Sequence, residues 1–181
     1  MPHALRRARF DAPELKRLPV APAVSADGAV EGYASLFGVV DLGRDRVERG
    51  AFSASLARRG ARGVRFLFQH DPSEPIGAWG QIVEDGRGLR VSGRLNLAVT
   101  RAREVHALLR QGALDGLSIG FRAVRSARGP GGVRRLVEID LWEVSVVTFP
   151  MLPDARVGAV KLRPSVSPAA ARGLSAREAA R

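Results

Sequence analysis

The 181-residue sequence contains no cysteine. This absence excludes disulfide bonds, thiolate metal sites and a cysteine nucleophile, and it fits a reducing compartment. No apolar run approaches the ~18 residues that a membrane-spanning helix needs, and no secretory signal follows Met1. We therefore expect a soluble, cytoplasmic protein without membrane contact.

Aromatic residues and histidines are scarce. With one tyrosine and two tryptophans, the chain lacks the alternation of aromatic and basic residues that is typical of a base-stacking surface. The three histidines, His3, His70 and His106, are dispersed and do not form a metal-ligand motif such as H-E-x-x-H. The sequence therefore predicts neither a metal site nor a cofactor.

Positive charge is in excess and lies mainly at the two ends. The net charge is +11, from 29 basic and 18 acidic residues. Residues 1–20 hold five basic and two acidic residues, and residues 161–181 hold five and one. Such tails can bind nucleic acid or an acidic protein surface. They are equally explained as solvated tails rich in alanine and arginine.

Periodicity divides the chain into three parts: a flexible basic arm over 1–27, a folded domain over 28–163, and a flexible Ala/Arg-rich tail over 164–181. Alternating apolar residues predict strands, with Pro72 and Pro75 interrupting the chain between two of them. The predicted strands are 30–37, 64–70, 76–83, 89–97, 117–124 and 133–147, with a charged loop or short strand at 43–49 and a last short element at 157–162.

Only two helices are expected, over 51–59 and 100–110, with Thr100 as the N-cap of the second and Val105, Leu108 and Leu109 as its apolar stripe. Six to seven strands with so few helices predict a mainly β fold. We expect a closed or nearly closed antiparallel β-barrel flanked by helices. A doubly wound α/β fold is disfavoured because helices do not alternate with strands.

Three chemically competent side chains stand in otherwise apolar, strand-like stretches: His70, Ser118 and Glu143. A serine nucleophile, a histidine base and an orienting carboxylate together make a hydrolytic triad. Each residue alone also has a structural explanation. His70 could be a buried structural histidine, and Glu143 could pair with one of the many arginines.

Glycines flank Ser118 at Gly116 and Gly120. Small neighbours permit close approach of a substrate and free backbone N–H groups for an oxyanion hole. The run G-L-S-I-G is nevertheless not a nucleophile elbow, because strand-like residues follow where the elbow requires a helix. The alternative is a strand whose glycines allow curvature.

Five stretches in order, spread over about residues 30–160, resemble the tailed-phage prohead (capsid maturation) proteases, distant relatives of the herpesvirus assemblins. They are E-G-Y-A at 31–34, R-G-A-F at 49–52, F-Q-H-D at 68–71 with P-I-G at 75–77, G-L-S-I-G-F at 116–121, and L-W-E-V-S-V-V at 141–147 with F-P at 149–150. Two residues depart from the family pattern: Arg46 follows Asp45, and Met151 follows the last proline, where the family often has alanine.

The resemblance implies a serine endopeptidase on a herpesvirus-protease-like β-barrel, with His70, Ser118 and Glu143 as its catalytic residues. Backbone N–H groups near Gly120 are expected to support the oxyanion, and Arg122 is a candidate electrostatic contributor. The assemblins use a second histidine as the third member of their catalytic triad. The assignment of Glu143 as the acidic member therefore rests on the pattern of the prohead proteases alone.

The implied substrates are the scaffold protein, the major capsid protein and the protease itself, inside an assembling prohead in the bacterial cytoplasm. The resemblance leaves room for a homodimer. The rival interpretation is a non-catalytic capsid-assembly or nucleic-acid-binding module that uses the basic tails.

Overall fold

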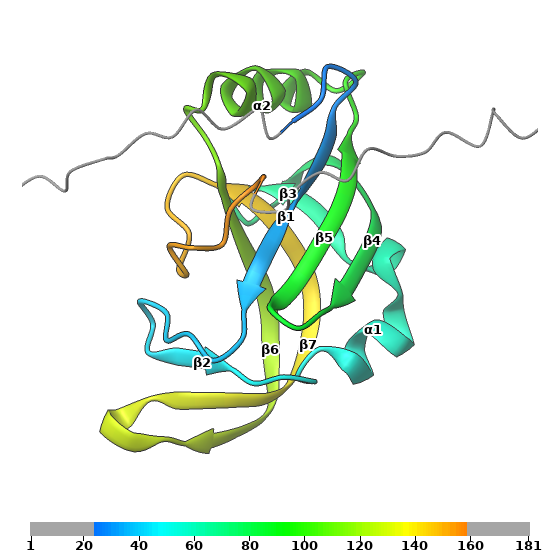
Figure 1. Ribbon diagram of the computed structural model, residues 1–181. Helices are drawn as coiled ribbons and strands as arrows, with labels where there is room; N and C mark the ends of the chain where they lie inside the picture. Colours follow the sequence, from blue (N-terminus) through cyan, green and yellow to red (C-terminus); the bar gives the residue numbers. More distant parts are fainter. Residues whose placement is uncertain (1–23, 159–181) are drawn as a thin grey trace, which may run out of the picture.

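The computed structural model describes residues 24–158, which form seven strands, two α-helices and two short 3₁₀ helices (Figure 1). The strands are β1 (Ala29–Leu36), β2 (Asp45–Val47), β3 (Arg65–Phe68), β4 (Asp71–Glu84), β5 (Gly88–Leu95), β6 (Gly116–Arg128) and β7 (Arg134–Val147). The helices are α1 (Ser53–Arg59) and α2 (Thr100–Gln111), and the 3₁₀ helices are η1 (Ala61–Gly63) and η2 (Pro130–Gly132). The prediction of a mainly β protein is confirmed.

All seven strands belong to one sheet, and β7 pairs with three of the others. Successive strands pair in the order β1-β5-β4-β3-β7-β2, and β6 pairs with β7 along its whole length. The start of β7 pairs with β2 and its end pairs with β3, and both of these pairings are parallel. The predicted antiparallel pairing therefore holds for four of the six strand pairs and is wrong for these two, because sequence periodicity does not report the direction of a partner that is distant in the chain.

The sheet curves into a half-barrel but does not close. Its open side lies between β1 and β6, where residues 155–158 make only single bridges, Gly32 to Val157 and Gly116 to Arg156. Backbone bonds from Tyr33 N–H to the Arg156 carbonyl and from Leu117 N–H to the Ala155 carbonyl hold this segment in place. The closed barrel is thus not confirmed, since a short connecting segment takes the place of a closing strand.

Contrary to the prediction, the two prolines do not interrupt the chain between two strands but lie within β4. Pro72 and Pro75 lie inside β4, which begins at Asp71 rather than at Ile76 as predicted. The pairing of β3 with β4 shifts register beside them, at Leu67 and Phe68. Proline is compatible with such irregular pairing because it has no N–H to donate to a regular ladder.

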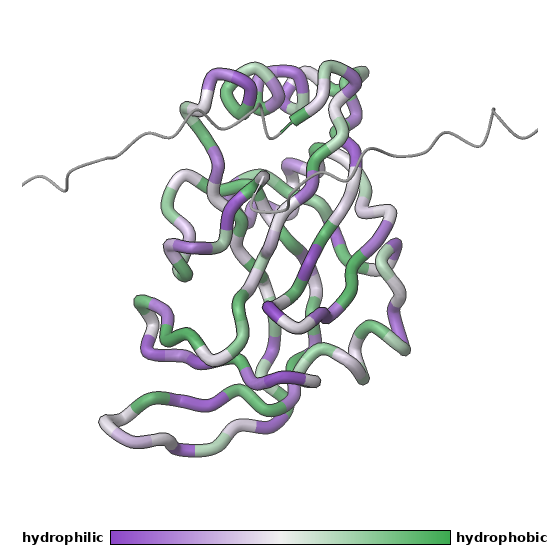
Figure 2. The backbone as a smooth tube through the Cα atoms, in the orientation of Figure 1, coloured by the Kyte–Doolittle hydropathy of each residue, from purple (hydrophilic) through white to green (hydrophobic). Residues whose placement is uncertain are grey.

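The buried apolar side chains form one main cluster with members from all seven strands and a smaller cluster of four residues, and green and purple segments alternate along the strands (Figure 2). In the main cluster the rings of Phe66 and Trp79 stack with centroids 3.8 Å apart. Helix α2 covers one end of the sheet (Figure 1) and buries Ala102, Val105 and Leu109.

Two details of α2 differ from the prediction. Leu108 is 37% exposed rather than part of the buried stripe. Thr100 is the first helical residue and Val99 is the N-cap; the Thr100 hydroxyl accepts a hydrogen bond from Arg103 instead. A threonine whose hydroxyl accepts a hydrogen bond from a side chain of its own helix does not cap the free backbone N–H groups of the first turn.

Residues 24–27, the last four of the predicted N-terminal arm, include contacts with the folded domain. Val24 is 2% exposed and bridges to Val30, and the Ser25 carbonyl accepts a bond from His106 Nε2 at 2.9 Å. The rest of the predicted arm, the predicted tail over 164–181 and most of the element over 157–162 lie outside the described residues. Among the helices of residues 24–158, none is long and apolar enough to cross a membrane.

We predict that Val24→Ala lowers the free energy of unfolding by about 1–3 kcal/mol, because it removes buried methyl groups and leaves a gap in the core. Val124→Ala is the matched control, since Val124 is 52% exposed. Urea unfolding checks both variants. Equal stability of the two would show that residues 24–27 belong to the arm as first expected.

Candidate active site

Adjacent strands carry the predicted serine and carboxylate. Along the β6–β7 ladder, Ser118 pairs with Ser145 and Gly120 pairs with Glu143. Ser118, Glu143 and Ser145 are all buried, at 6%, 9% and 0% exposure. Side chains two residues apart on a strand share one face, so Ser118 and Gly120 lie beside Ser145 and Glu143 on the same side of the sheet.

A strained turn brings the histidine onto this face. β3 runs parallel to β7 up to the pair Phe68 and Val146, and the Gln69 N–H donates to the Val146 carbonyl at 2.9 Å. Gln69 and His70 then both adopt positive φ, 55° and 61°. Non-glycine residues in this region cost of order 1–3 kcal/mol each and persist only where neighbouring contacts hold them.

Side-chain bonds hold the turn. The Gln69 amide donates from Nε2 to Thr148 Oγ1 at 2.6 Å, and the Thr148 N–H donates back to Gln69 Oε1 at 3.3 Å. The His70 N–H donates to Ser145 Oγ at 3.2 Å. Residues at and just after the end of β7 therefore hold both residues of the left-handed turn, Gln69 and His70.

The three predicted residues form one hydrogen-bonded row. His70 Nδ1 lies 2.5 Å from Glu143 Oε1, and His70 Nε2 lies 3.0 Å from Ser118 Oγ. Because the carboxylate can only accept from Nδ1–H, Nε2 of the neutral ring is left as an acceptor for the Ser118 hydroxyl. The side chain of His70 is 42% exposed, so the row opens to solvent at the imidazole.

Hydrogen bonding to Glu143 raises the pKa of the His70 imidazole above its usual 6.5, while partial burial opposes this shift. The bond favours the protonated ring because the carboxylate carries the opposite charge. An imidazole in this setting is a stronger base than a free one.

Ser145 completes the row and was not predicted. Its hydroxyl donates to Glu143 Oε2 at 2.6 Å and accepts the His70 N–H, so both carboxylate oxygens have partners. The signal was visible in the sequence, since Ser145 follows Glu143 at the same strand parity in L-W-E-V-S. Its contact with the His70 N–H could not be predicted, because the sequence does not give the position of the His70 backbone.

Gly120 leaves room for the carboxylate. A Cβ atom built at Gly120 would overlap Oε1, Cδ and Cγ of Glu143. This close approach explains the glycine sterically. Its predicted part in an oxyanion hole stays a prediction.

Arg122 contacts a different carboxylate, Asp140, at 3.8 Å. Asp140 also accepts bonds from Arg59 and Arg58, with Arg59 at 3.1 and 3.0 Å, and from the indole N–H of Trp142 at 2.8 Å. These bonds, first of all that from Arg59, hold the pKa of the Asp140 carboxyl well below its usual range. The side chain of Arg122 is 68% exposed, and its predicted electrostatic contribution stays a prediction.

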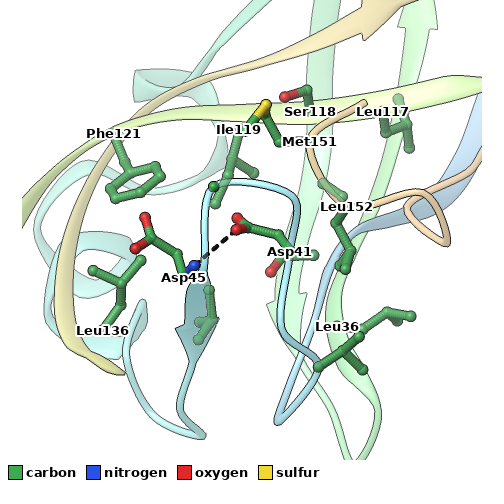
Figure 3. A pocket seen from close by; sticks show the side chains of 15 residues that line it. Leu36, Asp41, Asp45, Leu117, Ser118, Ile119, Phe121, Leu136, Met151 and Leu152 are labelled. Carbon is green, nitrogen blue, oxygen red and sulfur yellow. Dashed lines mark hydrogen bonds between the residues drawn. The ribbon is translucent and has the colours of Figure 1, made fainter. Parts of the chain in front are cut away.

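A cavity of about 120 Å³ opens beside Ser118 (Figure 3). Its walls come from β1, β2 with the loop before it, β6, and β7 with the loop after it. Within residues 24–158, no three histidine or carboxylate side chains lie close enough together to hold a metal ion.

Comparison with known proteins identifies the family. The sequence profile described as caudovirus prohead serine protease matches residues 17–166. The chain belongs to this family. The prohead protease of Enterobacteria phage HK97 is 32% identical over 165 residues, which are 89% of this chain and 71% of that protein. The chain is therefore a serine protease of prohead maturation.

Two further relatives extend the comparison. A capsid polyprotein of Pseudomonas phage PAJU2 is 31% identical over 105 residues, 54% of this chain and 16% of that protein. The solved capsid assembly protease of bacteriophage T4 has a TM-score of 0.58 at 15% identity, covering 68% of this chain and 84% of that one. The T4 protein thus shares the fold of this prohead protease, and herpesvirus proteases are also among the structural matches.

We predict that Ser145→Ala lowers the proteolytic rate roughly 10- to 100-fold, because a buried carboxylate oxygen and the His70 N–H each lose a partner, at about 1–3 kcal/mol per group. Ser55→Ala is the matched control. Ser55 is equally buried and bonds the Leu141 N–H and Asp140, away from His70.

The control should lower thermal stability and leave the rate per folded molecule unchanged. Peptide cleavage and circular dichroism of both variants test this. An unchanged rate in Ser145→Ala would assign Ser145 to the core alone.

Proposed function

We propose that Ser118, His70 and Glu143 are the catalytic triad of this prohead protease. Ser118 Oγ attacks the scissile carbonyl carbon while His70 Nε2 takes its proton, and Glu143 stabilises the imidazolium that forms. His70 then gives the proton to the leaving amine, and water repeats the sequence on the acyl-enzyme. The observation that supports these roles is the unbroken row from Ser118 Oγ through the ring to Glu143, at 3.0 and 2.5 Å.

The rigidity of the site supports the same assignment. The base is held by a strained turn, the carboxylate has a partner on each oxygen, and the nucleophile lies on a paired strand. Groups that are already held in the reactive geometry lose little entropy on reaching the transition state. This pre-organisation is a main source of rate acceleration in enzymes.

The proposed substrates are the scaffold protein, segments of the major capsid protein and the protease chain itself. The family carries out prohead maturation, and the PAJU2 relative is a capsid polyprotein in which the matched region makes up 16% of the chain. A protease joined to a capsid protein in one chain would meet its substrate at high local concentration.

The rival interpretation, a non-catalytic module that acts through basic tails, depends mostly on residues outside the described part. Phosphate binding by such tails would weaken steeply between ~50 and 200 mM salt. Peptide hydrolysis would instead depend on Ser118. The hydrogen-bonded row in the folded domain favours the enzyme.

We expect Ser118→Ala to abolish cleavage of the co-expressed capsid protein, because loss of a triad nucleophile typically costs on the order of 10⁶ in rate. Ser126→Ala is the control, since Ser126 is an exposed serine of the same strand. Gel analysis and mass spectrometry of the particles report processing. Full processing by the Ser118 variant would end the proposal.

The pH profile should report the coupling between His70 and Glu143. The base acts when neutral, so kcat/KM should fall on acidification through a pKa above 6.5. In Glu143→Gln this acidic limb should move to lower pH and the rate should drop, though less than in His70→Ala. Glu138→Gln, on the same strand, should leave the limb unchanged.

The same pKa shift has a consequence for stability. A raised pKa in the folded state stabilises the protein fully below the unfolded pKa of about 6.5, and this contribution is lost as pH rises through the folded-state pKa. Glu143→Gln should remove that dependence. A Gln variant whose acidic limb and stability profile match the wild type would show that another group orients His70.

A further inference from the structure

The cavity beside Ser118 differs from an ordinary apolar pocket, because its lining includes two carboxylates. We propose that it binds a basic side chain, lysine above all, of the substrate residue next to the scissile bond. This inference rests on the proposed role of Ser118 as nucleophile. A side chain next to the attacked carbonyl must lie within a few ångströms of Ser118 Oγ, since reacting atoms approach to about 3–3.5 Å.

The cavity has the dimensions of one medium-sized side chain. Its volume of about 120 Å³ is somewhat below the roughly 150 Å³ of a cavity that binds one benzene ring. Leu117, Ile119 and Phe121 of β6 form one wall, and Leu36 and Leu152 face them (Figure 3). These apolar walls suit the methylene stem of a lysine.

Two loops close over the cavity as a single rim. The Leu42 N–H donates to the Met151 carbonyl at 2.9 Å, so the loop before β2 and the loop after β7 are joined. Met151 and Val39 line the cavity and are 49% and 38% exposed, so they form its mouth. A side chain can therefore enter from solvent past this rim.

The charge inside the cavity is not balanced. Asp45 forms a bidentate pair with the guanidinium of Arg134, at 2.7 and 2.5 Å. Asp41 accepts the Asp45 N–H at 2.8 Å, but no basic side chain of residues 24–158 forms an ion pair with it. Asp41 and Asp45 line the cavity (Figure 3). Arg134 lies outside this lining and supplies one positive charge that acts on both carboxylates, so a net negative charge remains for a ligand to neutralise.

Partial burial raises the pKa of the Asp41 carboxyl, which means that its charge is poorly solvated when the cavity is empty. An ammonium group supplied by the substrate would relieve this. A substrate carboxylate would be repelled, and an uncharged aliphatic side chain would fill the walls but leave Asp41 unpaired.

The first measurement is a cleavage-site survey. A bacterial proteome digested with a glutamate-specific protease gives peptides with internal lysines and arginines intact, and mass spectrometry identifies the bonds that the prohead protease cuts. We expect lysine and arginine to be enriched at one position adjacent to the cut. Enrichment of apolar or acidic residues there would overturn the inference while leaving the proposed triad in place.

The second measurement uses a matched pair of peptides derived from the best cut site, with lysine or norleucine at that position. The two share a stem and differ in charge. We expect kcat/KM to favour lysine roughly 10- to 100-fold, the range of a charge-assisted hydrogen bond. In Asp41→Asn, which keeps an acceptor for the Asp45 N–H, the ratio should fall to about one while norleucine cleavage continues.

Asp154→Asn is the control for general loss of negative charge, because Asp154 is an exposed residue of the loop after β7 that does not line the cavity. It should keep the lysine preference. A preference that survives in Asp41→Asn overturns the inference. Failure of the wild type to cut any peptide, with Ser118→Ala equally inactive, would instead overturn the proposed function.

Discussion

The register between β6 and β7 is the constraint on which the rest of the site depends. It sets Ser118 against Ser145 and Gly120 against Glu143. A slip by one residue would turn every one of these side chains to the opposite face of the sheet. Gly120 also fixes the pairing sterically, because only a residue without a Cβ leaves space for the Glu143 carboxylate. The remaining member, His70, is added from a third strand by a turn that the end of β7 holds in a strained conformation.

Much of this arrangement could be predicted from the sequence. Alternation of apolar and polar residues was sufficient to predict β6 and β7, and the motif resemblance pointed to His70, Ser118 and Glu143, which the structure brings together. The parallel contact of β3 with β7 could not be predicted in this way, because local periodicity carries no information on strand direction. The positive φ angles of Gln69 and His70 could not be predicted from the sequence either, because residues other than glycine seldom adopt them.

The cavity shows a second limit of sequence reasoning. Asp41 lies in the loop before β2, and Asp45 is the first residue of this three-residue strand, which is too short to show a regular period. The role of each carboxylate depends on which of them pairs with Arg134 of β7. Met151, one of the two departures from the family pattern, lies at the mouth of the same cavity. The hydrogen-bonded row and the rim of the cavity thus differ in structure: two paired strands and the turn after β3 hold the row, whereas two loops joined by one backbone hydrogen bond form the rim.

The most direct test of the triad is covalent labelling with a fluorophosphonate, which reacts with a serine activated by a neighbouring base. Mass spectrometry of the labelled, folded protein should locate the phosphonyl adduct on Ser118, and His70→Ala should lose the adduct while keeping its fold. An adduct on another serine, or an equal rate of labelling in His70→Ala, would contradict the assignment of Ser118 and His70 as nucleophile and base.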